Sequence, residues 1–302
     1  MSKHILSALI LVPLSGVVQA ASEPSEQAIR HARQDPNRSG APITIPLELR
    51  DNFAFLVATV DGVDVRLKFD LGSSSALLLQ QSVVDRIKAV PHGEHAKFQS
   101  IDGVFESPQF KVSRVQLGSA VFADVITTLD APRPGYEPGP FAQGFLGTGL
   151  LKSYEVVLDY PHRTMTLVPR SNESVSGSCK GTVVPFSQSS SKWRGEPVTE
   201  AGTDLGPLIL WWDTGAPVSA LRKTAIRDVR SQSSGDTVTM NRLTLGGGDF
   251  GPWQFEIWDM SLPGFDGFIG YDFFAKHVVC IDFPGSRVVI RQPGQGASEG
   301  LR

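Results

Sequence analysis

Short runs of apolar residues, many of them β-branched or aromatic, follow one another along the chain and are separated by turn residues. Such runs lie at residues 43–49, 53–60, 63–69, 111–117, 156–158 and 288–290. Runs of this length and composition predict β-strands. Asp61-Gly62, between the second and third runs, predicts a tight hairpin turn. Only residues 81–89 predict a helix, so the pattern indicates an all-β protein with many turns, in keeping with its 30 glycines and 21 prolines.

Two halves of the chain repeat each other in order. Gln143–Gly147 recurs as Asp266–Gly270, and Val156–Pro161 recurs as Val279–Pro284 at the same spacing. Further upstream, Val115–Gly118 recurs as Leu243–Gly246, and Asp70–Ser73 recurs as Asp213–Ala216. One such match arises easily by chance, but four in the same order indicate a duplicated module.

The N-terminus has the features of a secretory signal peptide. Lys3 and His4 precede an apolar run at residues 5–14, and the segment ends at Ala20. The run is about half the length that a membrane-spanning helix needs. We therefore expect cleavage after Ala20 and a periplasmic or secreted protein without stable membrane insertion.

The repeat and the composition together predict the domain boundaries. Residues 1–20 are the signal peptide, 21–42 a polar leader, 43–170 the N-terminal lobe, 171–180 a Ser/Gly-rich joint, 181–293 the C-terminal lobe and 294–302 a flexible tail. A hydrophobic content of 41% is sufficient for a substantial core in a chain of this length.

Charge and motifs exclude several classes of partner. A net charge of -3 disfavours nucleic acid as a ligand. The glycines at residues 246–248 lack the lysine and hydroxyl residue of a phosphate-binding loop, so no nucleotide is expected. His92 and His95 have no third clustered ligand nearby, so neither a metal nor any other cofactor is expected.

The chain has two cysteines, Cys179 and Cys280. In an oxidising compartment they could form a disulfide within the C-terminal half. Alternatively, Cys280 could be a small buried residue of the apolar run at residues 278–281. The sequence leaves both possibilities open.

Candidate chemistry lies in the two Asp-x-Gly turns. Asp70 and Asp213 each follow an apolar run, and Gly72 and Gly215 allow a tight turn there. In a duplicated protein the two turns can meet around a pseudo-twofold axis. Two carboxylates a few ångströms apart share one proton, so one can accept a proton from water while the other polarises a carbonyl.

This arrangement resembles the retropepsin-like and pepsin-like aspartic proteases, in the bacterial form with two fused retropepsin-like lobes. The resemblance rests on Asp213-Thr214-Gly215-Ala216, on the partner strand Gly267-Phe268-Ile269-Gly270 and on their repeats in lobe one, and it spans nearly all of the mature chain. It implies a bilobal pepsin-like fold of two duplicated β-barrel lobes with a cleft between them. It also implies that Asp70 and Asp213 are catalytic and that Gly72, Ser73, Thr214, Gly215, Gly147 and Gly270 support them.

Within the resemblance, Ser73 would hydrogen-bond the first carboxylate, and Thr214 would form half of an interlock between the lobes. Leu71 departs from the family pattern, because it replaces the threonine of the other half. Trp211 should share the side of Asp213, since strand neighbours alternate. Together with Trp211, the flap and substrate-binding residues implied by the resemblance are Ile101, Asp102, Gly103 and Val104.

We therefore expect a monomeric endopeptidase that hydrolyses polypeptides between its lobes, beneath the flap. The alternative is a catalytically impaired pseudoprotease that binds peptides or proteins in the periplasm without cutting them, and it is motivated by Leu71.

Overall fold

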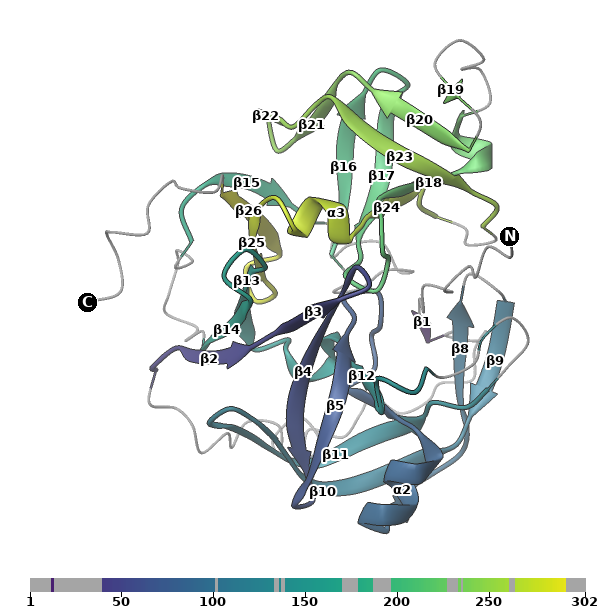
Figure 1. Cartoon of the computed structure of the whole chain (residues 1–302), viewed down its shortest axis with the longest axis vertical. Coiled ribbons are helices and arrows are strands. Elements are labelled where there is room, and N and C mark those ends of the chain that lie inside the picture. The colour runs from purple at the N-terminus through teal and green to yellow at the C-terminus, as the bar shows by residue number, and fades with distance from the viewer. Residues whose placement is uncertain are drawn as a thin grey trace, which may run out of the picture.

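A computed structural model describes residues 12–13, 40–100, 103–132, 136, 139–169, 179–186, 197–226, 233–234, 236–260 and 264–291. It is built almost entirely of β-strands, arranged in four sheets (Figure 1). Most of the predicted signal peptide, leader and joint, and the whole tail, lie outside the described residues. Within them, no helix is long and apolar enough to cross a membrane.

Lobe one is built around an eight-stranded sheet. Its strands, in spatial order, are β3 (Glu48–Arg50), β4 (Phe53–Val60), β5 (Val63–Phe69), β12 (Gly144–Leu146), β6 (Leu77–Leu79), β11 (Ala120–Leu129), β10 (Gln109–Leu117) and β7 (Val90–Pro91). The hairpin predicted at Asp61-Gly62 joins β4 and β5, and both of its residues have positive φ, as a tight hairpin turn requires. The predicted helix is confirmed as α2 (Gln81–Ile87), which buries Val83 and Val84.

A separate hairpin extends from lobe one, formed by β8 (Ala96–Ser100) and β9 (Gly103–Ser107). Phe98 of β8 stacks on Phe105 of β9 with ring centroids 5.4 Å apart. On its other edge, β8 pairs antiparallel with β1 (Val12–Pro13), which lies within the predicted signal peptide. The hairpin thus forms a small three-stranded sheet of its own, at the right of Figure 1.

Lobe two is built around a nine-stranded sheet, at the top of Figure 1. Its strands, in spatial order, are β19 (Ser233–Ser234), β20 (Thr237–Met240), β23 (Trp253–Trp258), β18 (Ala220–Arg222), β24 (Gly267–Ile269), β17 (Gly206–Trp212), β16 (Val198–Thr203), β21 (Leu243–Leu245) and β22 (Gly248–Asp249). The short helix α3 (Tyr271–Phe274) follows β24, in the position that the 3-10 turn η1 (Thr148–Leu150) occupies after β12.

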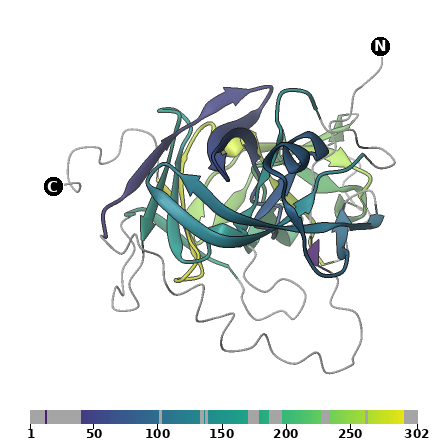
Figure 2. The same cartoon turned by 90° about the horizontal axis from the view of Figure 1, so that it is seen from below.

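The two halves of the chain share a six-stranded sheet. Its order is β15 (Thr182–Pro185), β26 (Arg287–Arg291), β25 (Val278–Asp282), β13 (Tyr154–Asp159), β14 (Thr164–Pro169) and β2 (Ile43–Pro46). At its centre β13 pairs with β25, so that the two copies of one repeated segment lie side by side. Figure 2, a view from below, shows the same sheets with lobe one toward the reader.

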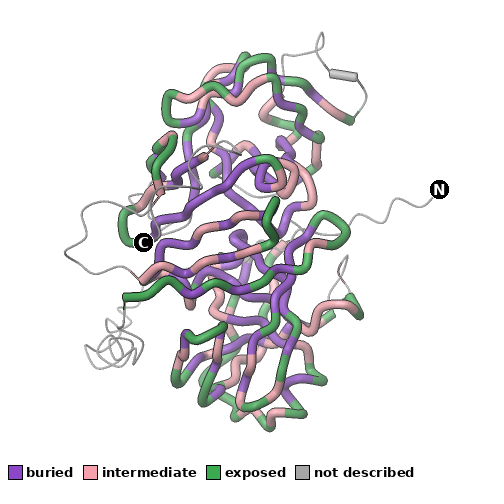
Figure 3. The backbone as a smooth tube through the Cα atoms, turned by 60° about the vertical axis from the view of Figure 1, so that its left-hand side comes forward, coloured by how far each residue is buried: buried purple, intermediate pink, exposed green. Residues whose placement is uncertain are grey.

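Packing around the shared sheet continues into both lobes. A single apolar cluster contains buried residues of each lobe and of the shared sheet, among them Leu71, Leu158, Trp212 and Ile281. Figure 3 shows buried residues along the strands and exposed ones mainly at the turns. Cys179 and Cys280 form a disulfide, which ties the chain before β15 to β25. The bridge considered from the sequence is thus present, and the alternative of a free Cys280 is wrong.

Candidate active site

The two aspartates are delivered by equivalent strands. β5 ends immediately before Asp70, and β17 ends immediately before Asp213. Each strand pairs in parallel with the glycine-containing strand of its own lobe, β12 or β24. The backbone N–H of Asp70 donates to Leu146 at 3.0 Å, and that of Asp213 donates to Ile269 at 3.0 Å. The duplication therefore repeats the backbone support of each acid.

Both carboxyl groups are fully buried, and each is oriented by its own turn. The N–H of Gly72 donates to Asp70 Oδ1 at 2.9 Å, and the N–H of Gly215 donates to Asp213 Oδ1 at 2.7 Å. In the part of the chain that the structure describes, neither Oδ2 receives a hydrogen bond from a donor group. One oxygen of each acid is thus held by backbone, and the other is left for proton exchange.

The two acids meet although 143 positions separate them. A Cβ placed on Gly72 would lie 2.7 Å from Asp213 Oδ1, and one placed on Gly215 would lie 2.5 Å from Asp70 Oδ1. Real Cβ atoms do not approach oxygen so closely. Glycine is therefore required in each turn because the carboxylate of the opposite lobe occupies the space of a side chain.

The electrostatics of the pair favour a shared proton. Burial raises the pKa of Asp70 well above its usual value, and the charge of Asp213 raises it further. Burial also raises the pKa of Asp213, to about 6, while the N–H of Gly215 and the charge of Lys68 act in the opposite direction. Because two buried carboxyl groups that approach each other this closely cannot both ionise cheaply, they hold one proton between them over the acidic range.

Thr214 of lobe two is hydrogen-bonded to the backbone of lobe one next to Asp70. Thr214 Oγ1 accepts a hydrogen bond from the N–H of Leu71 at 2.9 Å and donates one to the carbonyl of Phe69 at 3.1 Å. Thr214 is fully buried, as is Leu71, whose side chain packs into the main core. Half of the interlock is thus built, and leucine fills the other half with apolar packing.

Ser73 does not make the bond that the family resemblance implies. Its Oγ is buried and makes no hydrogen bond to any residue described here. The hydroxyl instead faces Gly147, where an added Cβ would lie 2.9 Å from it. The expected bond to Asp70 is therefore wrong for this structure, in which the N–H of Gly72 bonds Asp70 Oδ1.

Gly147 and Gly270 act as close-packing positions. A side chain on Gly147 would collide with the backbone carbonyl of Ser75, and one on Gly270 would collide with the backbone of Val218. Ser75 and Val218 both belong to the turn that follows an aspartate. These glycines therefore let the partner strand press against each aspartate turn.

The expected flap residues are only partly described, since Ile101 and Asp102 lie outside the described residues. Gly103 pairs with Ser100 at the start of β9, and the side chain of Val104 is 60% exposed. Trp211 is fully buried and packs edge-on against Phe265, with ring centroids 5.2 Å apart. It therefore forms part of the interior of lobe two.

One charged residue near the acids was missed by the sequence analysis. Lys68 precedes Asp70 by two positions on β5 and is only 8% exposed. Its Nζ lies 4.4 Å from the ring centroid of Phe53 and 4.6 Å from that of Phe145. Its charge lowers the pKa of both aspartates. Strand alternation, which places Lys68 on the side of Asp70, was the available signal.

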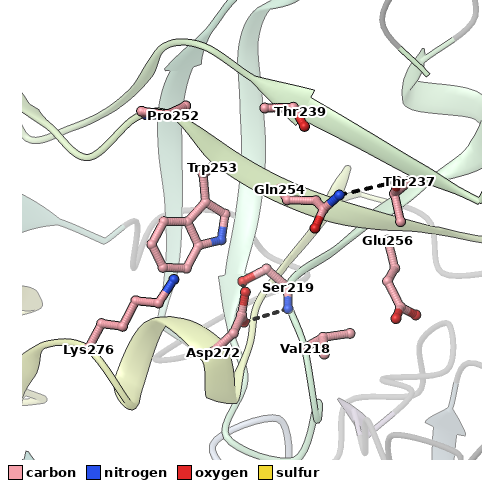
Figure 4. A pocket seen from close by; sticks show the side chains of 10 residues that line it. All are labelled: Val218, Ser219, Thr237, Thr239, Pro252, Trp253, Gln254, Glu256, Asp272 and Lys276. Carbon is pink, nitrogen blue, oxygen red and sulfur yellow. Dashed lines mark hydrogen bonds between the residues drawn. The ribbon is translucent and has the colours of Figure 1, made fainter. Parts of the chain in front are cut away.

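Lobe two also has a surface pocket of about 540 Å³ between β20, β23 and α3 (Figure 4). On its wall, Asp272 Oδ1 accepts hydrogen bonds from the N–H of Ser219 at 2.6 Å and from its hydroxyl at 2.8 Å. Burial raises the pKa of Asp272. Ser219 Oγ in turn accepts the N–H of Gly270 at 3.0 Å. These bonds tie the turn after Asp213 to α3. Neither Asp70 nor Asp213 lines the pocket.

One group of three potential metal ligands occurs among the described residues, namely Glu155, Cys179 and Cys280. Both sulfur atoms are joined in the disulfide, and Glu155 Oε1 accepts the N–H of Cys179 at 3.1 Å. These three residues therefore attach the chain before β15 to the shared sheet, through the disulfide and this hydrogen bond.

Comparisons with known proteins agree with this geometry. The model of the aspartyl protease family matches residues 56–149, which lie in lobe one. The crystal structure of an aspartic proteinase from Irpex lacteus is similar with a TM-score of 0.58 and 14% sequence identity, over 86% of this chain and all of that chain. No curated protein sequence matches significantly. Lobe one thus matches the aspartyl protease family, and the chain has the bilobal fold of a pepsin-like aspartic proteinase.

Proposed function

We propose that this protein is an aspartic endopeptidase, with Asp70 and Asp213 as its catalytic pair. The observation that carries the proposal is the meeting of two fully buried carboxyl groups, one from each lobe, each held by one backbone N–H. Buried acids that share a proton near neutral or acidic pH are suited to general acid–base chemistry.

The reaction follows from the protonation of the pair. The ionised carboxylate accepts a proton from a water molecule, whose oxygen attacks the peptide carbonyl carbon. The protonated partner donates its proton to the carbonyl oxygen, and a tetrahedral diol forms. One carboxyl group then protonates the amide nitrogen while the other takes a proton from the diol, so the C–N bond breaks and the pair returns to its starting state.

Substrate binding is proposed to use strand pairing beneath the β8–β9 hairpin. In the full chain, the outer edge of β8 pairs with β1. Removal of residues 1–20 takes β1 away and makes this edge available to an extended polypeptide, a common mode of peptide recognition. Export with cleavage after Ala20, and action as a monomer, belong to the same proposal.

Leu71 is the feature that favours the alternative, a binding protein without activity. The hydrogen bonds around Leu71, however, are also compatible with catalysis. The N–H of Leu71 still donates to Thr214 Oγ1, and the carbonyl of Phe69 still receives the threonine hydroxyl. The lost hydroxyl is replaced by a fully buried apolar side chain. The interlock therefore remains anchored on both lobes.

The test is cleavage of a denatured protein by the mature chain between about pH 3 and 7. We expect wild-type cleavage to fall at least about a thousandfold in Asp70→Asn and in Asp213→Asn, since each removes one half of the acid–base pair. A transition-state-mimicking inhibitor of aspartic proteases should block cleavage by the wild-type protein. Asp51→Asn, an exposed substitution in lobe one, serves as the control.

Absence of inhibitor-sensitive cleavage by folded wild type at every pH would reject the endopeptidase. Binding of peptides by that inactive protein would support the pseudoprotease instead. The mass of the protein recovered from the cell exterior or periplasm checks export, because cleavage after Ala20 predicts Ala21 as its first residue.

A further inference from the structure

We propose that the surface pocket of lobe two binds short peptides whose amino and carboxyl ends are both free, and that it pairs with both charged ends. The pocket lies between β20, β23 and α3 and has a volume of about 540 Å³ (Figure 4). Pockets that bind small molecules range from about 300 to 1,000 Å³. The inference goes beyond the proposed function and does not depend on it, because binding is measured without cleavage.

Charged side chains of both signs line this pocket. Asp272 and Glu256 contribute carboxyl groups, and Lys276 contributes an ammonium group. Within the part of the chain that the structure describes, none of the three forms an ion pair. Figure 4 shows Lys276 and Glu256 toward opposite ends of the pocket, with Asp272 between them. Separated and unpaired charges of both signs fit a ligand that itself carries both signs.

The carboxyl groups have oxygens left for a ligand. Asp272 Oδ1 accepts the N–H and the hydroxyl of Ser219, and no other described residue bonds Oδ2. Glu256 Oε2 accepts the indole N–H of Trp258 at 2.9 Å, and Oε1 receives no hydrogen bond from a described residue. Both carboxyl groups are thus oriented by a neighbour on one oxygen. An ammonium group, which has three N–H donors, can pair with the remaining oxygens.

The opposite end of the pocket has donors without acceptors. Lys276 Nζ lies 4.4 Å from the centroid of one ring of Trp253. Trp253 is only 7% exposed, and its indole N–H has no hydrogen-bond partner among the described residues. Figure 4 shows the indole nitrogen on the edge of the ring that faces Ser219, among the lining side chains. Because a buried donor without an acceptor costs free energy, the indole and the ammonium together favour a ligand carboxylate at this end.

The two signs and their separation define the class of ligand. A simple cation would be repelled by Lys276, and a simple anion would be repelled by Asp272 and Glu256. Since Lys276 and Glu256 lie toward opposite ends, the charges of the ligand must be held apart by a few residues rather than on one carbon, as in a free amino acid. Short peptides with two free ends meet both conditions. They are also the products of polypeptide hydrolysis.

The experiment is calorimetric titration at about pH 7.5 of the protein carrying Asp213→Asn, which keeps the probes intact. The probes are trialanine, trialanine amide, N-acetyl-trialanine and alanine. Amidation removes the negative end of the peptide, and acetylation removes the positive end. We expect trialanine to bind at least about fivefold more tightly than each of the other three, because each lacks one charge or the separation of the two.

Variants of the pocket assign each end of the peptide. In Lys276→Met, trialanine and its amide should bind alike, while acetylation still weakens binding. In Asp272→Asn, trialanine and N-acetyl-trialanine should bind alike, while amidation still weakens binding. Glu256→Gln, at an exposed position, is the second variant if Asp272→Asn prevents folding, and it should lower the preference over N-acetyl-trialanine. Glu200→Gln, an exposed substitution on β16, is the control and should retain every ratio.

The proposal is overturned if trialanine does not bind, if the blocked peptides bind as tightly as trialanine, or if alanine does. Ratios that stay the same in Lys276→Met and Asp272→Asn would also overturn it, because they would place the binding elsewhere on the protein. None of these measurements requires cleavage, so a failure of the endopeptidase proposal leaves their outcome unchanged.

Discussion

The two lobes have the same backbone around the acids but different side chains. Both contain a strand that ends at aspartate, a glycine whose N–H bonds the carboxylate and a partner strand with a close-packed glycine. At matching side-chain positions, however, lobe one has Leu71 and Lys68 where lobe two has Thr214 and Trp211. The backbone is repeated because each acid needs the same geometry, whereas the side chains at the interlock differ because one threonine already bonds the backbone of the opposite lobe.

A second difference lies in how each turn is anchored. Lobe two ties the turn after Asp213 to α3 through Ser219 and Asp272. Ala76 and Gly149 take the matching positions in lobe one and have no side-chain polar group. There, Thr148 bonds the carbonyl of Ser73 through both its N–H, at 2.8 Å, and its hydroxyl, at 3.1 Å. The two lobes thus reach one backbone geometry through different hydrogen bonds.

The largest effect is expected at the glycines that both lobes share. Gly72→Ala and Gly215→Ala should each lower kcat/KM at least about a hundredfold, because the new methyl group would displace the opposite carboxylate from its position. Steady-state cleavage of a peptide measures this effect. Gly139→Ala is the matched control, since an added Cβ there meets no atom within 4 Å. Near wild-type activity in either dyad variant would contradict the close approach of the lobes.

The interlock should be sensitive at Thr214, where it has hydrogen bonds. Thr214→Val keeps the shape of the side chain but removes one acceptor and one donor, so we expect the free energy of unfolding to fall by about 2–3 kcal/mol. Urea unfolding checks this value. The exposed Thr239→Val provides the reference, and a loss no larger than its own would show that the interlock adds little to stability.

The acid pair should make stability depend on pH in a defined direction. Because the pKa of Asp213 is raised to about 6, the folded protein binds protons more tightly than the unfolded chain, and stability falls as the pH rises from about 4 to 6. Asp213→Asn cannot ionise, so it should be more stable than wild type at pH 7 by about 3 kcal/mol.

Thermal unfolding at several pH values measures this difference, which should shrink to near zero below about pH 4. Asp51→Asn, at an exposed position, is the control. A variant less stable than wild type at pH 7 would contradict the burial of an ionisable pair.

The smallest effect is expected at the anchor found only in lobe two. Ser219→Ala removes the hydroxyl that bonds Asp272 and Gly270, so unfolding free energy should fall by about 1–2 kcal/mol. The backbone bond from Ser219 to Asp272 remains. Ser113→Ala, an exposed serine of β10, is compared in the same urea titration. An equal change in unfolding free energy in Ser219→Ala and Ser113→Ala would mean that the anchor does not contribute to stability.

Much of the fold was accessible from the sequence because local patterns specify it. The Asp61-Gly62 hairpin, the strands around it and α2 follow from short β-branched and aromatic runs, turn residues and one helix-forming run. The Asp-x-Gly turns were recognisable for the same reason, since a tight turn leaves a glycine in a fixed place. Their repetition predicted two lobes.

The role of side chains was less accessible. The bond expected from Ser73 is absent because its hydroxyl faces Gly147, a matter of packing between separate strands. Lys68 lies in a predicted strand, but the strand pattern alone does not predict its burial between Phe53 and Phe145, which come from two other strands. Neither neighbour is close to Lys68 along the chain.

By itself, the sequence determined the strands, the turns, the duplication and the identity of the two acids, because these depend on residues that are neighbours in the chain. Only the tertiary structure decided that Asp70 and Asp213 each lie against the glycine of the opposite turn, that Thr214 bonds the backbone of Phe69 and Leu71, and that Lys68 and Trp211 are buried. The physical reason is that the contacts between the two aspartate turns join segments more than 70 residues apart, which no local pattern specifies.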